Sequence, residues 1–262
     1  MVTALKNTVY EVFSYREVLA NILSQELKVK YKRTYFGYFW SLLNPLLQLS
    51  VLALVFSHIV NRGIKDYSLY LFSGLLAWNF FQSSTVTSAT CLLENENFIK
   101  KIYLPKIIFP LSRLLVRGVE FVFSFFALAI LAVVFGFHFS WVVLLLPFAV
   151  FLLFTFSLGV TLLASVMTVY FRDVQYLMGV FLQLLYFATP IMYPVSMLPE
   201  RYAFYLGLNP IYRLILIFQK LLYEGVLPSS SEWIVAVLIS FGTLIAGLLL
   251  LNAKDEDIVF RM

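Results

Sequence analysis

Long apolar segments dominate the chain once a basic stretch ending near residue 33 has passed. Each segment is about 20 residues long, which is the length of an α-helix that crosses about 30 Å of hydrocarbon. Short clusters of glycine, proline or charged residues separate the segments. The pattern predicts an all-α integral membrane protein with a single transmembrane domain, 1–262, whose six spans cover residues 37–60, 68–92, 114–137, 141–169, 174–194 and 231–252.

The segment before the first span, residues 8–33, predicts a helix with two unlike faces. At 100° per residue, apolar residues such as Val12 and Leu23 share one arc, and polar residues such as Lys28 lie opposite. A helix of this kind suits the membrane interface. Arg16 falls within the apolar arc, so a soluble flap is the alternative. The segment lacks an uninterrupted apolar core, and we therefore do not expect a removable signal peptide.

Two connections between spans are too long to be simple turns. Residues 94–111 start with a polar run and contain prolines, which predicts a short amphipathic helix at about 95–107 that suits docking of a cytosolic partner. A solvated loop is the alternative for this connection. The second connection contains Asn209–Pro210, a helix-start signal, and Gly225, a helix stop. It predicts re-entrant helices at about 199–224, and a seventh full span is the less favoured alternative.

Composition supports a membrane protein and excludes other classes. Hydrophobic residues make up 61% of the chain and charged residues 13%, with a mean hydropathy of +0.89. Soluble domains average about 45–50% apolar and about 25% charged residues. A nucleic-acid binder would need more surface charge. One cysteine excludes an intrachain disulfide, and two distant histidines predict no metal site.

The basic residues predict the orientation of the chain. Fourteen of the 19 lysines and arginines fall in the amino-terminal segment, the second-to-third and fourth-to-fifth connections and the tail. Cytoplasmic flanks of membrane spans carry the excess of these residues. We therefore expect both termini in the cytoplasm, in agreement with an even number of spans.

Residues capable of chemistry are sparse. No phosphate-binding G-x-x-x-x-G-K-[ST] motif is present, so ATP-driven work would require another subunit. Paired carboxylates or histidines suited to a membrane enzyme are also lacking, and we predict that the chain is not an enzyme. Glu120 is the one acid well inside a predicted span, with Arg117 at i−3. We expect a structural ion pair between them, with a relay of motion as an alternative.

Four stretches carry a resemblance to a known family. ELKVKYKRTYFGYFWSLLNPLLQL at 26–49 resembles the start of the first span in membrane subunits of ATP-binding-cassette exporters for cell-surface polysaccharides, namely O-antigen, capsule and teichoic acid. ENENFIKKIYLPKIIFPLS, YFRDVQYLMG and ATPIMYPVSMLPERYAFYLGLNPIYRLI are similar to that family in order and spacing. The resemblance covers nearly the whole chain.

The resemblance implies a type-2 exporter fold, in which each subunit of a homodimer has six spans, an interface helix, a coupling helix and re-entrant helices. It implies that two cytosolic nucleotide-binding subunits bind ATP and magnesium, whereas this chain binds no cofactor. A lipid-linked polysaccharide would then cross the bacterial cytoplasmic membrane between spans one and five of the two protomers. The alternatives are an exporter of the same architecture for a drug or lipid, and a non-transporting scaffold.

The resemblance and the aromatic content of 18% also suggest site residues. Rings can pack on sugar C–H faces without strong hydrogen bonds, although packing against lipid is the alternative for each. The expected channel-lining rings are Phe36, Phe39, Trp40, Tyr186, Phe187 and Tyr193. The expected contacts with the nucleotide-binding subunit are Asn97, Lys100, Lys101, Ile102, Tyr103, Lys106 and Ile107. A lipid-linked diphosphate would be attracted by Lys28, Lys30, Lys32 and Arg33, for which ordinary topology-setting charge is the alternative.

Overall fold

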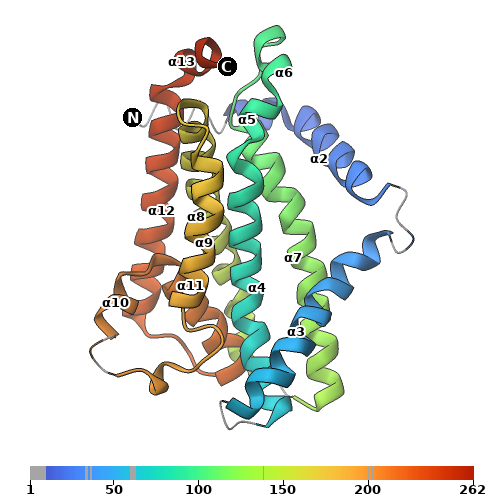
Figure 1. Cartoon of the computed structure of the whole chain (residues 1–262), viewed down its shortest axis with the longest axis vertical. Coiled ribbons are helices and arrows are strands. Elements are labelled where there is room, and N and C mark those ends of the chain that lie inside the picture. The colour runs from blue at the N-terminus through green and yellow to red at the C-terminus, as the bar shows by residue number, and fades with distance from the viewer. Residues whose placement is uncertain are drawn as a thin grey trace.

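A computed structural model describes residues 10–32, 35, 37–59, 63–137, 139–199, 201 and 203–262, and strands are absent from these residues. Long helices run side by side, and short helices lie at both ends of the bundle (Figure 1). The α-helices are α2 (Arg16–Tyr31), α3 (Trp40–Ile59), α4 (Ile64–Ala89), α5 (Cys91–Glu94), α6 (Glu96–Lys101), α7 (Ile108–Phe135), α8 (Leu146–Tyr170), α9 (Val174–Ala188), α10 (Ala203–Leu208), α11 (Pro210–Gln219), α12 (Ser230–Ala253) and α13 (Asp255–Arg261). The 3₁₀ and π turns are Gly37–Phe39, Trp141–Leu145, Val195–Met197 and Lys220–Glu224.

Within the described residues, three helical segments are long and apolar enough to cross a membrane: Ile108–Phe135, Trp141–Tyr170 and Ser230–Ala253. The helices of the first and fifth predicted spans are shorter apolar segments, Trp40–Phe56 and Val174–Ala188. The second predicted span corresponds to α4, which is less apolar because it lies inside the bundle. Helices α3, α7, α8, α9 and α11 all contact it.

The burial of α4 explains how it tolerates its hydroxyl residues. Trp78, Phe72 and Leu75 are almost fully buried and form part of the main core. Most hydroxyl groups of α4 donate to carbonyl oxygens of the same helix, as Thr85 does to Phe81 at 2.9 Å, whereas the buried hydroxyls of Ser84 and Ser88 have no partner among the described residues. A hydroxyl satisfied in this way avoids the cost of an unpaired buried polar group. Most of the polar groups that this central helix buries are therefore compensated within the helix itself.

The most extensive helix–helix contact joins α8 and α12. Two glycines make it possible, because a Cβ atom at Gly159 would lie 2.4 Å from the backbone carbonyl carbon of Thr243. A Cβ atom at Gly247 would lie 2.7 Å from the carbonyl oxygen of Gly159. Small residues let helix backbones approach closely where no hydrophobic force drives association. The two helices therefore pack backbone against backbone.

Several helix ends differ from the sequence prediction, and prolines explain two of them. The expected helix at 95–107 is helical only over Glu96–Lys101: the chain is extended at Ile102, and Pro105 prevents the helix from continuing past Leu104. The fifth predicted span, 174–194, ends as a helix at Ala188, since Thr189 is extended before Pro190. The helices that correspond to the second and third predicted spans, α4 and α7, begin earlier than expected, at residues 64 and 108.

The amino-terminal helix expected at 8–33 is interrupted and ends at Tyr31, and residues 8, 9 and 33 lie outside the described residues. Residues 10–14 are helical, Tyr15 interrupts the helix, and Lys32 is extended. At the other end of the bundle, α11 begins at Pro210, and Asn209 accepts a hydrogen bond from the backbone of Tyr212 at 3.3 Å. A π turn follows this helix and ends at Gly225, whose φ of 66° favours glycine. In the region predicted to hold re-entrant helices, the first α-helix is α10 at Ala203–Leu208, and it does not begin at residue 199.

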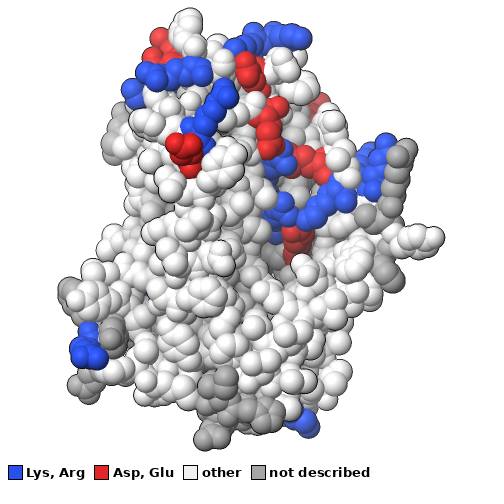
Figure 2. All heavy atoms as spheres, in the orientation of Figure 1, with Lys and Arg blue, Asp and Glu red and all other residues white. Residues whose placement is uncertain are grey.

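Charged side chains gather at one end of the molecule. Figure 2 shows them around α2, α6 and α13, whereas a wide middle belt of the visible face carries almost none. A few basic residues lie at the opposite end of this face. A broad uncharged belt between two charged ends is the pattern that a hydrocarbon layer imposes.

Candidate functional site

A cavity of about 540 Å³ opens where α2 meets the long helices. Helices α3, α4 and α7 form its walls, and Lys30 and Tyr31 of α2 border its outer side. Figure 2 shows acidic and basic side chains beside a hollow below α2. The lining is unusually polar for a helical bundle of this hydropathy, since it includes Ser41, Asn44, Gln48, Asn79, Gln82, Ser83, Thr87, Arg117, Glu120 and Ser124.

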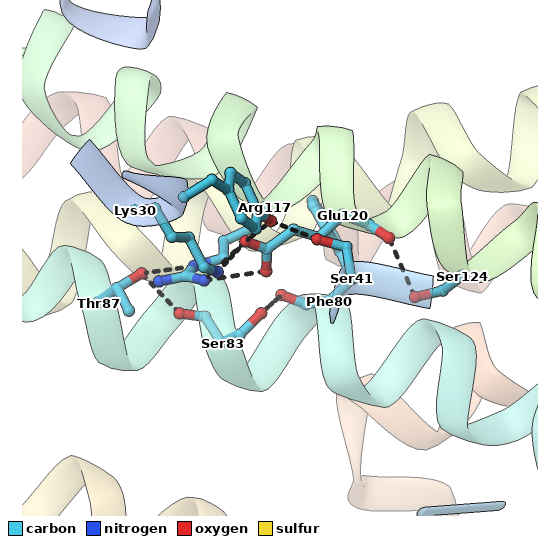
Figure 3. A network of polar contacts seen from close by, with 9 residues as sticks. Lys30, Ser41, Phe80, Ser83, Thr87, Arg117, Glu120 and Ser124 are labelled. Atoms are coloured by element: carbon cyan, nitrogen blue, oxygen red, sulfur yellow. Dashed lines mark hydrogen bonds and ion pairs between the residues drawn. The ribbon is translucent and has the colours of Figure 1, made fainter. Parts of the chain in front are cut away.

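Glu120 lies at the centre of the charged part of this cavity. Arg117 donates to both of its carboxylate oxygens, at 2.9 and 3.1 Å, and Lys30 of α2 forms an ion pair with it (Figure 3). Arg117 also contacts the hydroxyl of Thr87 on α4 at 3.4 Å. Tyr31 of α2 hydrogen-bonds to Ser41 of α3. The network ties three helices to α7, so Glu120 does more than form the i,i+3 pair expected from the sequence.

A second set of charges holds α2 against α7. Arg113 contacts Glu26 of α2 at 3.4 Å and Glu94 of α5 at 2.6 Å. Burial raises the pKa of the Glu26 carboxyl above its usual value, because the loss of water penalises the charged form more than the guanidinium of Arg113 favours it. No residue of α2 is fully buried. Polar contacts therefore contribute strongly to the position of this helix.

Uncharged carboxamides continue the polar lining away from the charged end. Asn79 of α4 donates to Gln48 of α3 at 3.2 Å, and Trp78 donates to Gln82 at 2.9 Å. These three carboxamides also line a second cavity of about 270 Å³, together with Gln183 of α9. The two cavities thus share a wall of polar side chains from α3 and α4, and α9 adds Gln183 to the smaller one.

Comparison with known proteins decides the family. Residues 18–223 match the family described as ABC-2 type transporter. The chain belongs to the ABC-2 type transporter family. It is therefore a multi-pass membrane protein and a subunit of a transporter.

Curated relatives of this transporter chain cover almost its whole length. The O-antigen export system permease protein RfbA of Myxococcus xanthus is 30% identical over 251 residues, which span 95% of this chain and 96% of the relative. RfbA of Klebsiella pneumoniae is 30% identical over 239 residues, or 90% of this chain and 91% of the relative. The polysialic acid transport protein KpsM of Escherichia coli is 24% identical over 237 residues, 88% of this chain and 91% of the relative.

The expected channel rings of the transporter fall in different places. Trp40 lines the larger cavity, whereas Tyr186 and Phe187 line the smaller one. Tyr193 lines a separate, mainly apolar groove among α8, α9, α10 and α11. Phe39 is exposed in the turn before α3, and Phe36 lies outside the described residues. The structure therefore brings together only part of the set.

Trp78 and the carboxamides were absent from the predicted channel set. The Trp78 ring lies 5.4 Å, centroid to centroid, from that of Tyr186, so it belongs to the same wall. Uncharged polar residues inside otherwise apolar spans were the available signal for the carboxamides. Charged groups and aromatic rings alone do not indicate the carboxamides.

The expected contacts with a nucleotide-binding subunit divide into two groups. Ile102 and Tyr103 are exposed, and Asn97, Lys100 and Lys101 lie on α6. Lys106 and Ile107 are instead buried, with relative exposures of 8% and 6%. Lys106 reaches Asp255 of α13 at 2.6 Å, and Lys100 donates to the carbonyl oxygen of Met262 at 2.8 Å. The carboxy-terminal helix therefore braces this segment from behind.

The basic residues expected near lipid headgroups also differ among themselves. Lys28 and Lys32 are exposed at the end of α2, and Arg33 lies outside the described residues. Lys30 points into the larger cavity and pairs with Glu120 (Figure 3). Lys30 therefore shares the single negative charge of Glu120 with Arg117, whereas the sequence suggested an open position near the headgroups.

Proposed function

We propose that this chain is the channel-forming membrane subunit of an ATP-driven exporter that moves a lipid-linked polysaccharide across the bacterial cytoplasmic membrane. The match to an O-antigen export permease over 95% of the chain is the observation that carries the proposal. The uncharged carboxamides of α3, α4 and α9 support it, because a hydroxyl-rich polymer needs hydrogen-bonding groups without strong fixed charge.

In this proposal, two copies of the chain face each other, and α3, α4, α7, α8, α9 and α12 each cross the membrane. The helices α10 and α11 enter it from the outside and return. The charged end formed by α2, α6 and α13 lies in the cytoplasm, since cytoplasmic flanks carry the excess of lysine and arginine. Both termini are then cytoplasmic.

Energy for export comes from a separate subunit that binds ATP and magnesium. We assign its docking surface to α6 and the extended residues after it, where Ile102 and Tyr103 are exposed apolar side chains among basic residues. Lys106 and Ile107 support this surface from inside. An exposed apolar patch at a charged end is typical of a protein–protein contact.

The lipid-linked diphosphate of the substrate would approach below α2. Lys28 and Lys32 supply unburied positive charge at this level. Arg117 and Lys30 lie deeper, at the mouth of the larger cavity, where the carboxylate of Glu120 offsets one of their two positive charges. The polymer would then follow the route past Trp40 and the rings of Tyr186 and Phe187.

Affinity purification of the tagged chain from its native membranes, with an ATPase assay, tests this proposal. We expect a stoichiometric nucleotide-binding subunit and ATP hydrolysis. Ile102→Glu should release that subunit, because it places a charge in the apolar centre of the docking surface. Leu227→Glu is the matched control, since Leu227 is equally exposed at the opposite end of the molecule.

The outcomes separate the alternatives. Loss of the partner with Ile102→Glu but not with Leu227→Glu supports the docking surface. A complex without a nucleotide-binding subunit and without ATPase activity would leave the exporter without an energy source and favour a scaffold. Accumulation of the polysaccharide inside cells that lack the chain identifies polysaccharide, and not a drug or a free lipid, as the substrate.

A further inference from the structure

Four carboxamides lie near the middle of the proposed membrane layer. Gln48 is eight residues into α3, and Gln183 is nine residues into α9, which places both about 12 to 14 Å from the helix starts. The hydrocarbon layer is about 30 Å thick. Asn79 and Gln82 of α4 reach the same level, because they line the same cavity. Polar groups at this depth are costly unless they contact water, protein or substrate.

Contacts within the chain use only part of the hydrogen-bonding capacity of these groups. A carboxamide has two N–H donors and a carbonyl oxygen that accepts two hydrogen bonds. Gln48 and Gln82 each accept one bond through this oxygen, from Asn79 and Trp78. Among the described residues, no partner is present for the amino groups of Gln48 and Gln82 or for the side chain of Gln183. These donors and acceptors border the cavity.

We propose that these carboxamides, with the rings of Trp78 and Tyr186, form a binding site for one neutral sugar unit of the moving polymer. This inference rests on the proposed function. Each carboxamide offers donors and an acceptor, which match the donating and accepting character of a sugar hydroxyl. The adjacent aromatic rings offer apolar surface for the C–H face of the sugar.

The size and charge of the site favour a neutral sugar over other ligands. The smaller cavity has a volume of about 270 Å³, below the range of about 300–1,000 Å³ for drug-sized ligands. The cavity in one copy of the chain therefore has room for about one sugar ring, and its open side leads on to the neighbouring surface. No charged residue lines this cavity in the described structure, so an anionic group would find no compensating cation there.

The competing explanation is that the carboxamides hold helices together, as polar residues do in membranes. The bond from Asn79 to Gln48 joins α4 to α3 and fits that role. Gln82 and Gln183 do not, because the one bond of Gln82 stays within α4 and Gln183 bonds to no described residue. The decisive substitutions are therefore Gln82→Met and Gln183→Met, which keep the side-chain length and remove the amide.

The experiment measures export of a neutral hexose polymer on a lipid diphosphate, by the complete complex reconstituted in vesicles. We expect Gln82→Met with Gln183→Met to lower the export rate about tenfold, because two hydrogen bonds are lost and each changes an equilibrium by about two- to tenfold. Gln183→Asn should retain export within about twofold, because it keeps the amide. Ser50→Ala is the control, since the Ser50 hydroxyl bonds to the Leu46 carbonyl at 2.6 Å and does not border either cavity.

Assembly is measured on the same samples, as the mass of the complex in detergent and its melting temperature. Reduced export with unchanged mass supports the sugar site. The double variant should melt somewhat lower, because Gln82→Met leaves the buried Trp78 N–H without its acceptor, whereas Gln183→Met alone should reduce export without a lower melting temperature. Unchanged export by the double variant would overturn it, as would reduced export that is accompanied by dissociation. If the unaltered complex exports no polymer, the proposed function fails first and the sugar site fails with it, which is a different result from a defect confined to the variants.

Discussion

Replacing Glu120 by glutamine tests the network that ties α2 and α4 to α7. The substitution keeps the shape of the side chain and removes its charge, which leaves Arg117 and Lys30 facing each other without an anion. Hydrogen bonds to charged groups contribute about 1.5–3 kcal/mol each. The side chains of Arg117 and Glu120 are 17% and 21% exposed, and that of Lys30 is 37% exposed, so water compensates part of the loss. We expect a net destabilisation of about 2 kcal/mol.

A change of this size shifts the melting temperature by about 4–8 °C for a chain of this length. Tryptophan fluorescence of the purified protein in detergent, recorded during heating, measures the shift. Glu96→Gln is the matched control, because its ion pair with Lys100 has both side chains 40% exposed and contributes only about 0.3–0.5 kcal/mol. Equal shifts for the two variants would refute the reasoning that the partly buried network stabilises the bundle.

Three further predictions use the same melting assay. Gly159→Ala should destabilise by about 1–3 kcal/mol, because its Cβ meets backbone on α12, whereas Gly242→Ala meets nothing within 4 Å and should not destabilise. Asp255→Asn should lower the melting temperature more than Lys106→Met, because it leaves the buried ammonium of Lys106 without its anion. A larger loss for Lys106→Met would contradict this account. Because the pKa of Glu26 is raised in the folded chain, the folded chain binds more protons than the unfolded chain just above pH 4.5. The wild type should therefore lose stability relative to Glu26→Gln as the pH rises through that window. A difference in melting temperature between the two proteins that does not change with pH would argue against this account.

The positions of the long helices could be predicted from hydropathy, because lipid-facing segments must be apolar over a fixed length. Their ends could not be predicted as well. The helix at 95–107 was expected to continue past Ile102, yet an extended segment ahead of Pro105 ends it after Lys101. Local sequence showed the proline, but not how far upstream the chain leaves the helix.

The candidate site was only partly predictable for a different reason. The Arg117–Glu120 pair follows from i,i+3 spacing on one helix. The ion pair from Lys30 depends on how α2 crosses α7, which no local pattern contains. The same limit applies to the carboxamides of α3, α4 and α9, whose common wall exists only after the helices have packed.

The close packing of α8 on α12 has a mechanical consequence for the segment that follows α6. Helix α13 follows α12 directly and holds Lys106, so the segment after α6 is fastened to a pair of helices whose backbones touch. Interiors packed this tightly transmit displacement instead of absorbing it. We therefore expect a displacement of residues 102–107 to move α8 and α12 together as one rigid unit. The less tightly packed helices α2 and α3 should then change their positions relative to that unit.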